Sequence, residues 1–365
     1  MTKPSFRMFD TYEDPVFVTG RDGVTVYTNK AAQNVLGLSR EPADMASRLD
    51  GLFFSPISSD AVGGGVALGG PMCFRISETG GYRVFRLTPV GVHVPDDGTN
   101  ALLLRNESAV RTALGSAMAQ LKVARARLLA HSKREDKVAV EALGAVNRHL
   151  YETLRAVDHT RFILEEGTVP SLDIPLRFDM CLLLMETAAQ FKSCLYGRPI
   201  NITFEREDKY LWFVGHRRLV RRAMLSAVTQ RLMHMESGNI RLSLRRQGSG
   251  CVFTVADDGP APDMEELSRR LSQHRTVADI IRGQDPGSEE NYLRVVAAVH
   301  DGAVLFHRAP EDLRNRTEVS FYPREEKVMV MNGGSVNEMD LDLLYMELAP
   351  VTASSEYAEY LHPDA

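Results

Sequence analysis

The N-terminal third of the chain alternates short apolar runs with turn residues. Apolar runs at 16–19 and 24–27 flank Arg21-Asp22-Gly23, and this order predicts a β-hairpin. Residues 29–37 follow as a short helix that ends at a glycine. We expect three further strands, at 72–76, 82–87 and 101–104. The glycines at 63–65 and 69–70 are placed in loops, and Gly80-Gly81 in a hairpin turn.

Between residues 106 and 167 the chain has no proline, and its apolar residues repeat every three or four positions. This spacing predicts two long helices joined by the polar turn 131–136. Each helix carries an apolar stripe, so a second copy of the hairpin would bury both stripes in a four-helix bundle, and we expect a homodimer. The stripes are Val110, Leu114, Ala117, Leu121, Ala124 and Leu128, and then Leu143, Val146, Leu150, Leu154 and Val157.

From about residue 171 helical and strand patterns mix, which predicts helices on one face of a mixed sheet. The helices are 178–195, with Leu182, Leu183, Met185 and Ala189 facing inward, 216–235 and 291–300. The strands are 201–204, 212–215, 240–244, 251–255, 303–306 and 317–322.

The last segment, from residue 328, contains no Lys or Arg and several acidic residues. Residues 341–348 form a candidate helix. Two interpretations stay open: the tail packs on the preceding domain, or it serves as an acidic interaction segment.

Composition narrows the class of protein. The 365 residues suffice for two or three domains, and 44% hydrophobic with 25% charged residues is typical of a soluble chain. The net charge of -5 disfavours a nucleic-acid partner. The four cysteines form no CxxC pair, which argues against zinc and disulfides and fits a reducing cytosol. With no signal peptide and no apolar run long enough for membrane insertion, we expect a cytoplasmic protein.

The order of elements resembles that of sensor histidine kinases over most of the chain. The run from Val16 to Gly37, with Asp22-Gly23 and Asn29-Lys30-Ala31-Ala32, resembles the start of a PAS domain. The resemblance implies an α+β multidomain protein. Its parts would be a PAS-like sensor domain (1–106), a helical-hairpin dimerisation and phosphoacceptor module (107–170), a histidine-kinase-type ATPase α/β sandwich (171–325) and an acidic tail (326–365).

The motif that carries the phosphoacceptor histidine is altered. Residues 108–114 read Ser-Ala-Val-Arg-Thr-Ala-Leu where the family has His-Glu-Leu-Arg-Thr-Pro-Leu, so Ser108 occupies the phosphoacceptor position. A hydroxyl with no adjacent base is a poor nucleophile for a γ-phosphoryl group. The hairpin also contains His131, His149 and His159, for which a surface or interface role is the simpler interpretation.

The nucleotide motifs are altered as well. Leu225 and Thr229 stand at the two asparagine positions of the family's metal-binding helix, where leucine cannot ligate Mg²⁺. The resemblance implies four nucleotide-binding residues: Asp257, which would accept a hydrogen bond from the adenine amino group, Gly259, Thr229 and Gly287. A simple turn after a strand explains residues 257–260 equally well.

Several other residues have simpler explanations than a binding role. We expect the arginines at 217–218 and 221–222 on a solvated helix face, Trp212 in the core, and His300-Asp301 at a helix end. His93, in a loop, is a poor haem ligand candidate.

Three functions follow from this resemblance. The first is an inactive pseudokinase scaffold that relays a PAS-sensed signal to a response regulator or another protein partner. The second is a divergent, active ATP-dependent protein histidine kinase of a phosphorelay. The third is a regulator that holds a small molecule in the PAS pocket. The sequence leaves open whether the chain is an enzyme and whether it holds ATP without turnover.

Overall fold

The computed structural model describes residues 6–20, 24–36, 60–67, 70–89, 99–131, 137–164, 175–195, 197–272, 288–323, 339–355 and 357. All structural statements below concern these residues.

The predicted N-terminal hairpin is confirmed. Its strands pair antiparallel with Phe17 opposite Thr28, and the turn at 21–23 lies outside the described residues. Asn29 fixes the start of the following helix, because its Oδ1 accepts from the amides of Ala32 (2.8 Å) and Val16 (2.9 Å). The elements are η1 (Arg7–Thr11), β1 (Val16–Gly20), β2 (Thr25–Thr28), α1 (Lys30–Leu36), β3 (Asp60–Ala67), β4 (Gly70–Thr79) and β5 (Tyr82–Pro89).

The prediction of a loop at residues 63–65 is wrong, because these glycines form the middle of β3. There they pair antiparallel with β11 (Ala303–Arg308), Gly64 lying opposite Val304. A Cβ on Gly63 would lie 2.4 Å from the Val304 oxygen, and one on Gly65 would lie 2.6 Å from the Ala303 Cα. Glycine is needed here for close approach of the strands and not for a turn.

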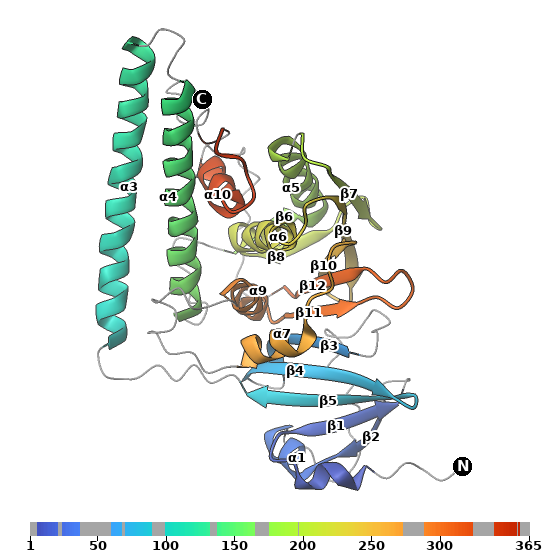
Figure 1. Ribbon diagram of the computed structural model, residues 1–365. Coiled ribbons are helices and arrows are strands. Elements are labelled where there is room, and N and C mark those ends of the chain that lie inside the picture. The colour runs from blue at the N-terminus through green and yellow to red at the C-terminus, as the bar shows by residue number, and fades with distance from the viewer. Residues whose placement is uncertain are drawn as a thin grey trace.

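A single sheet therefore runs from the N-terminal to the C-terminal part of the described chain. Its ten strands follow the order β2-β1-β5-β4-β3-β11-β12-β10-β9-β7 (Figure 1), and β7 pairs with β9 in parallel. A second sheet pairs β6 with β8. The remaining strands are β6 (Leu176–Asp179), β7 (Ile200–Arg206), β8 (Trp212–Gly215), β9 (Gly238–Gln247), β10 (Gly250–Asp257) and β12 (Asn315–Phe321).

The two long helices lie side by side, as predicted, but the first begins earlier (Figure 1). They are α3 (Thr99–His131) and α4 (Lys137–Leu164), so the predicted strand 101–104 is wrong. A short apolar run such as Ala101-Leu102-Leu103-Leu104 is compatible with either a strand or a helix, and here it belongs to the first turns of α3. Within the described helices no segment is both long and apolar enough to cross a bilayer.

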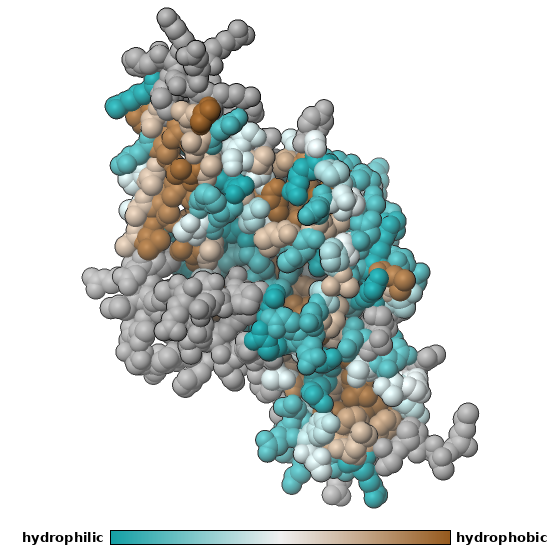
Figure 2. Space-filling model, viewed as in Figure 1, coloured by the Kyte–Doolittle hydropathy of each residue, from teal (hydrophilic) through white to brown (hydrophobic). Residues whose placement is uncertain are grey.

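Large apolar side chains remain exposed on this hairpin (Figure 2). Val110, Val123, Val138 and Val146 are 42%, 51%, 78% and 48% exposed. The opposite side of α4 is buried, and its buried residues include Tyr151 and Phe162. Of the four exposed valines, Val110 and Val146 belong to the predicted stripes, which are therefore partly uncovered, whereas Leu154 of the second stripe packs against the cluster around Tyr151.

Helix α5 (Met180–Cys194) starts later than predicted, because Asp179 caps it by accepting from the Cys181 amide at 3.0 Å. Phe178 belongs to β6. Of the four residues predicted to face inward only Leu183 is buried, because the helix turns a different face to the core. Its buried residues are Met180, Cys181, Leu183, Leu184, Thr187, Ala188 and Phe191.

Trp212 is not in the core, contrary to the prediction. Its side chain is 56% exposed on β8, and the Arg177 guanidinium lies 5.1 Å from its ring centre. In the short β6–β8 sheet it is Phe213 that turns inward, at 2% exposed. Trp212 therefore contributes a cation–π contact at the surface.

The remaining helices lie between the sheet and the hairpin (Figure 1). They are α6 (Arg217–Leu232), α7 (Met264–Ser272), α9 (Ser288–Val299) and α10 (Met339–Leu348), of which α7 was not predicted. The predicted tail helix is confirmed as α10, which contacts α4 and α6. One main core joins these helices to the sheet.

Candidate functional site

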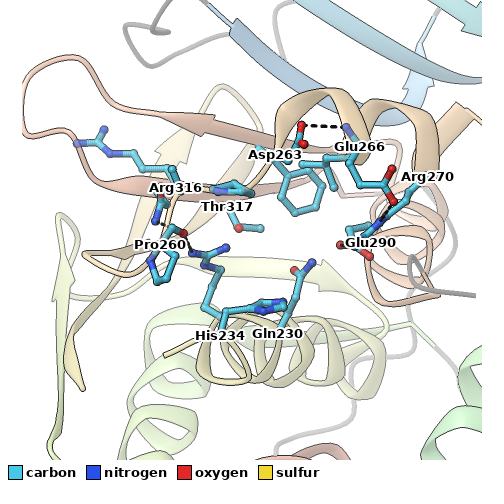
Figure 3. A pocket seen from close by; sticks show the side chains of 15 residues that line it. Gln230, His234, Pro260, Asp263, Glu266, Arg270, Glu290, Arg316 and Thr317 are labelled. Atoms are coloured by element: carbon cyan, nitrogen blue, oxygen red, sulfur yellow. Dashed lines mark hydrogen bonds and ion pairs between the residues drawn. The ribbon is translucent and has the colours of Figure 1, made fainter. Parts of the chain in front are cut away.

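A polar cavity of about 300 Å³ lies between helices α6, α7 and α9 and strands β11 and β12 (Figure 3). It sits beside the end of β10, where the sequence places the residues that would contact adenine. Its lining consists of Gln230, Arg231, His234, Pro260, Ala261, Pro262, Asp263, Glu266, Leu267, Arg270, Glu290, Phe306, Asn315, Arg316 and Thr317.

Asp257 lies behind this cavity, fully buried, and accepts four hydrogen bonds from the protein. Arg231 donates from Nε to Oδ2 (2.5 Å) and from Nη2 to Oδ1 (2.9 Å). The Asn315 Nδ2 and the Gly259 amide donate to Oδ1, each at 3.0 Å. Three of the four donors share Oδ1 and one binds Oδ2, so the described residues already engage both oxygens of this buried carboxylate.

Gly259 completes a tight turn after β10. Its carbonyl accepts from Asn315 Nδ2 at 2.9 Å, and a Cβ at this position would lie 2.7 Å from the Cγ of Met235. Both Asp257 and Gly259 therefore have structural roles that do not require a nucleotide. Their predicted nucleotide-binding role stays a prediction.

The two altered positions on α6 do not line the cavity. Leu225 and Thr229 are fully buried, and Gln230, Arg231 and His234 are the α6 residues that line it. Gly287, the fourth predicted nucleotide-binding residue, lies outside the described residues, as does His93.

Sequence reasoning missed Glu290 and Gln230 as cavity residues. Both side chains are 6% exposed. The nearest cation to Glu290 among the described ion pairs is Arg270, whose Nη1 lies 3.8 Å from Oε1. Burial raises the pKa of Glu290. The signal for Glu290 in the sequence is the acidic pair Glu289-Glu290 in the first turn of α9.

A second cluster of charged residues joins four helices. We call Arg155 and His159 (α4), Arg222 (α6), Glu289 (α9) and Glu347 (α10) the interhelical charge cluster. Glu347, fully buried, accepts from Arg222 Nε (2.8 Å) and Arg155 Nε (3.0 Å) and lies 3.1 Å from His159 Nε2. Arg155 also binds Glu289.

The cluster extends to the first hairpin helix through Asp158. Arg222 donates from Nη1 to Asp158 Oδ2 at 2.5 Å, and Arg111 of α3 also pairs with Asp158. Arg221 and Arg222 are 2% and 7% exposed, so the prediction of a solvated face is wrong for both. Carboxylates on other helices make burial of Arg222 tolerable, and a single sequence gives no sign of such partners.

The charge cluster shifts the pKa values of its carboxyl groups. Burial alone would raise the pKa of Glu289, but Arg155 and His159 lower it to about 2. Glu347 is also desolvated, yet His159, Arg222 and Arg155 hold its pKa far below the usual range. Both groups are therefore ionised at neutral pH.

The hairpin histidines differ in accessibility. His159 is 1% exposed and stacks on Tyr292 with ring centres 3.7 Å apart. The side chain of His149 is 64% exposed, and its Nδ1 lies 2.8 Å from Glu152 Oε2. His131 is the last residue of α3, and Ser108 lies in the same helix.

Outside the hairpin, His300 follows the end of α9, as predicted, and is buried. Its Nε2 accepts from the His216 amide at 3.2 Å. In the described part of the chain no three His, Cys, Asp or Glu side chains are placed to hold a metal ion.

Solved structures similar to this chain include histidine kinases. Acinetobacter baumannii histidine kinase AdeS matches at 10% identity over 57% of this chain and 96% of its own (TM-score 0.39). Full-length ShkA in complex with AMPPNP matches at 19% identity over 60% of this chain and 45% of its own (TM-score 0.46). Histidine kinase ThkA, in complex with response regulator protein TrrA, matches at 15% identity over 88% of this chain and 100% of its own (TM-score 0.37).

The chain is therefore distantly similar to sensor histidine kinases in structure. It matches no family model and no curated protein. Because all three TM-scores are below 0.5, the functional assignment below rests on the residues of this chain.

Proposed function

We propose that this chain is a catalytically inactive protein of the histidine-kinase type, a pseudokinase scaffold that relays a signal from its N-terminal region to a protein partner. The observation that carries the proposal is the carboxylate of Asp257, which is fully buried and has both oxygens engaged by the protein. An adenine amino group would have to displace Arg231 or Asn315 from it, which would leave a buried polar group unpaired at a cost of about 1–3 kcal/mol.

The interhelical charge cluster supports a scaffold in a second way. Phosphoryl transfer within a kinase requires its nucleotide domain to approach the phosphoacceptor helix. Here Glu347 of the tail binds α4 and α6 together through Arg155 and Arg222. A buried network of this kind favours one fixed arrangement of hairpin and globular part.

The predicted organisation becomes part of the proposal. We retain a PAS-like domain (1–106), a hairpin module (107–170), an ATPase-like domain (171–325) and a tail (326–365), with a homodimer formed through the exposed valines of the hairpin. A response regulator or another signalling protein is the proposed partner, and a small molecule in the PAS-like domain the proposed input.

Calorimetric titration with ATP, with and without Mg²⁺, tests the proposal. We expect no saturable heat at millimolar nucleotide for the natural chain and for R218A, which changes an exposed arginine on α6. R231A removes two of the four hydrogen bonds to Asp257, so weak ATP binding gained only in R231A would identify Arg231 as the blocking group. Mg²⁺-dependent binding of ATP by the natural chain, followed by transfer of its γ-phosphate, would contradict the proposal.

One observation favours a second candidate, a phosphorelay protein that accepts a phosphoryl group on His149. This imidazole is exposed, and Glu152 can hold its Nδ1 proton so that Nε2 is available to attack. Incubation with a phosphorylated receiver domain would give an acid-labile label that is lost in H149Q and kept in H159Q. Absence of any label would remove this candidate.

A further inference from the structure

The cavity beside Asp257 contains hydrogen-bond acceptors that the protein does not use. Within the described residues, Glu290 Oε2, Gln230 Oε1 and Asn315 Oδ1 have no hydrogen-bond partner. The three residues are 6%, 6% and 4% exposed, and all of them line this cavity. Figure 3 shows Gln230 of α6 and Glu290 of α9 directed into the space that α7 closes from the other side.

Each arginine of the lining is paired with a carboxylate, although the Nε of Arg316 has no hydrogen-bond partner among the described residues. Arg231 binds Asp257, Arg270 donates from Nε to Glu266 Oε1 at 2.9 Å, and Arg316 lies 2.8 Å from Glu311. His234 adds no positive charge at neutral pH, because partial burial and Arg231 lower its pKa. An anionic ligand such as a triphosphate would therefore meet Glu290 and Asp263 without an uncommitted arginine to offset them.

A ligand that donates hydrogen bonds would suit this lining better than an anion. An unpaired buried acceptor costs about 1–3 kcal/mol, which a donor from a ligand recovers. Glu290 can accept a cation, because its one partner among the described ion pairs is Arg270 at 3.8 Å from Oε1 and its Oε2 has no hydrogen-bond partner. Leu267 and Phe306 add an apolar wall for a carbon stem. The volume of about 300 Å³ is at the lower limit of small-molecule sites.

We propose that this cavity binds a small organic cation with a primary ammonium or guanidinium group, which donates N–H hydrogen bonds toward Glu290, Gln230 and Asn315. This site is independent of whether the chain transfers phosphate. It gives the ATPase-like domain a ligand of opposite charge to a nucleotide.

Titration calorimetry of the full chain at constant ionic strength tests the inference. The probes are 1,4-diaminobutane and 4-guanidinobutylamine, with tetramethylammonium as a cation that has no N–H donor and tripolyphosphate as an anion. We expect saturable binding of one or both amines, and none of tetramethylammonium or tripolyphosphate. E290Q keeps the side-chain shape and is expected to weaken amine binding about tenfold or more.

Two further variants keep the result interpretable. Q230M removes one acceptor at similar volume and should weaken the same binding, so the test survives if E290Q does not fold. E236Q, an exposed glutamate outside the lining, should change nothing. No saturable binding of either amine, equal binding of tetramethylammonium, or amine affinity unchanged in both E290Q and Q230M would each overturn the inference. Saturable binding of ATP would contradict the proposed pseudokinase and leave the amine-binding inference to be judged by the amine titrations.

Discussion

At the scale of single residues, Glu347 is a buried carboxylate that connects residues of two other helices. It is fully buried in a helix of the acidic tail, yet its carboxylate binds Arg155 and Arg222 and contacts His159. Buried charges of this kind are tolerated only while each has its partner. The tail therefore does more than add negative charge to the chain.

We expect E347Q to destabilise the protein by about 3–5 kcal/mol, because two buried guanidinium groups lose their shared counter-charge. Urea unfolding followed by circular dichroism measures this loss. E205Q, at a glutamate with a side chain 60% exposed, is the control and should change the free energy of unfolding by less than about 1 kcal/mol. A small effect in both variants would mean that the cluster does not hold the helices together.

Glu289 gives the stability a defined pH dependence. Its pKa in the folded chain is about 2 against an ordinary value of 4.5, because Arg155 and His159 outweigh burial. The unfolded chain thus takes up this proton first as the pH falls, so the stabilisation is complete above pH 4.5 and disappears toward pH 2. Free energies of unfolding for the natural chain and E289Q should converge over that window. A constant difference would contradict the shift.

The arginines show where sequence reasoning at this scale stops. A helix with arginines at 217–218 and 221–222 has the pattern of a solvated face, and Arg218 is indeed exposed. Arg222 is buried because carboxylates 64 and 125 positions away meet it. The turn after Asp257 was predicted, but its carboxylate is engaged by Arg231 and Asn315, which come next to it only after folding.

At the scale of elements, most helices and strands follow from apolar periodicity and turn residues. The failures are local. Gly63-Gly64-Gly65 was assigned to a loop because glycine weakens strands in general, whereas here a partner strand approaches too closely for any side chain. Helix α7 was missed because nine residues leave little periodic signal, although Asp263 before it and Glu265-Glu266 in its first turn are typical of a helix start.

The pairing of β3 with β11 makes Gly65 sensitive to substitution. In G65V the side chain would overlap Ala303 and the Gly302 oxygen, both about 2.6 Å from the new Cβ. We expect β3 to separate from β11, with hydrogen exchange of Ala303–His307 accelerated at least tenfold. G115A is the control: nothing lies within 4 Å of its new Cβ, so hydrogen exchange of Ala303–His307 should be the same as in the natural chain. Full protection in G65V would show that the strands pair in another way.

At the scale of the whole molecule, the exposed valines of the hairpin predict self-association. Val146 is 48% exposed on α4, on the face turned away from the globular part. V146K would place a charge in the proposed four-helix bundle, so light scattering should report a monomer where the natural chain is a dimer. V26K, at a valine 49% exposed on β2, should leave the dimer intact. A monomeric natural chain would refute the bundle.

The continuous sheet also determines how this protein can be divided. Strand β11 pairs with β3 on one side and with β12 on the other, so a fragment that begins after residue 98 would expose the β3-facing edge of β11 to water. Bare edges recruit strands from other molecules, and that recruitment ends in aggregates. Strands β3, β4 and β5 thus cover this edge, and we expect a fragment without them to aggregate where the full chain does not.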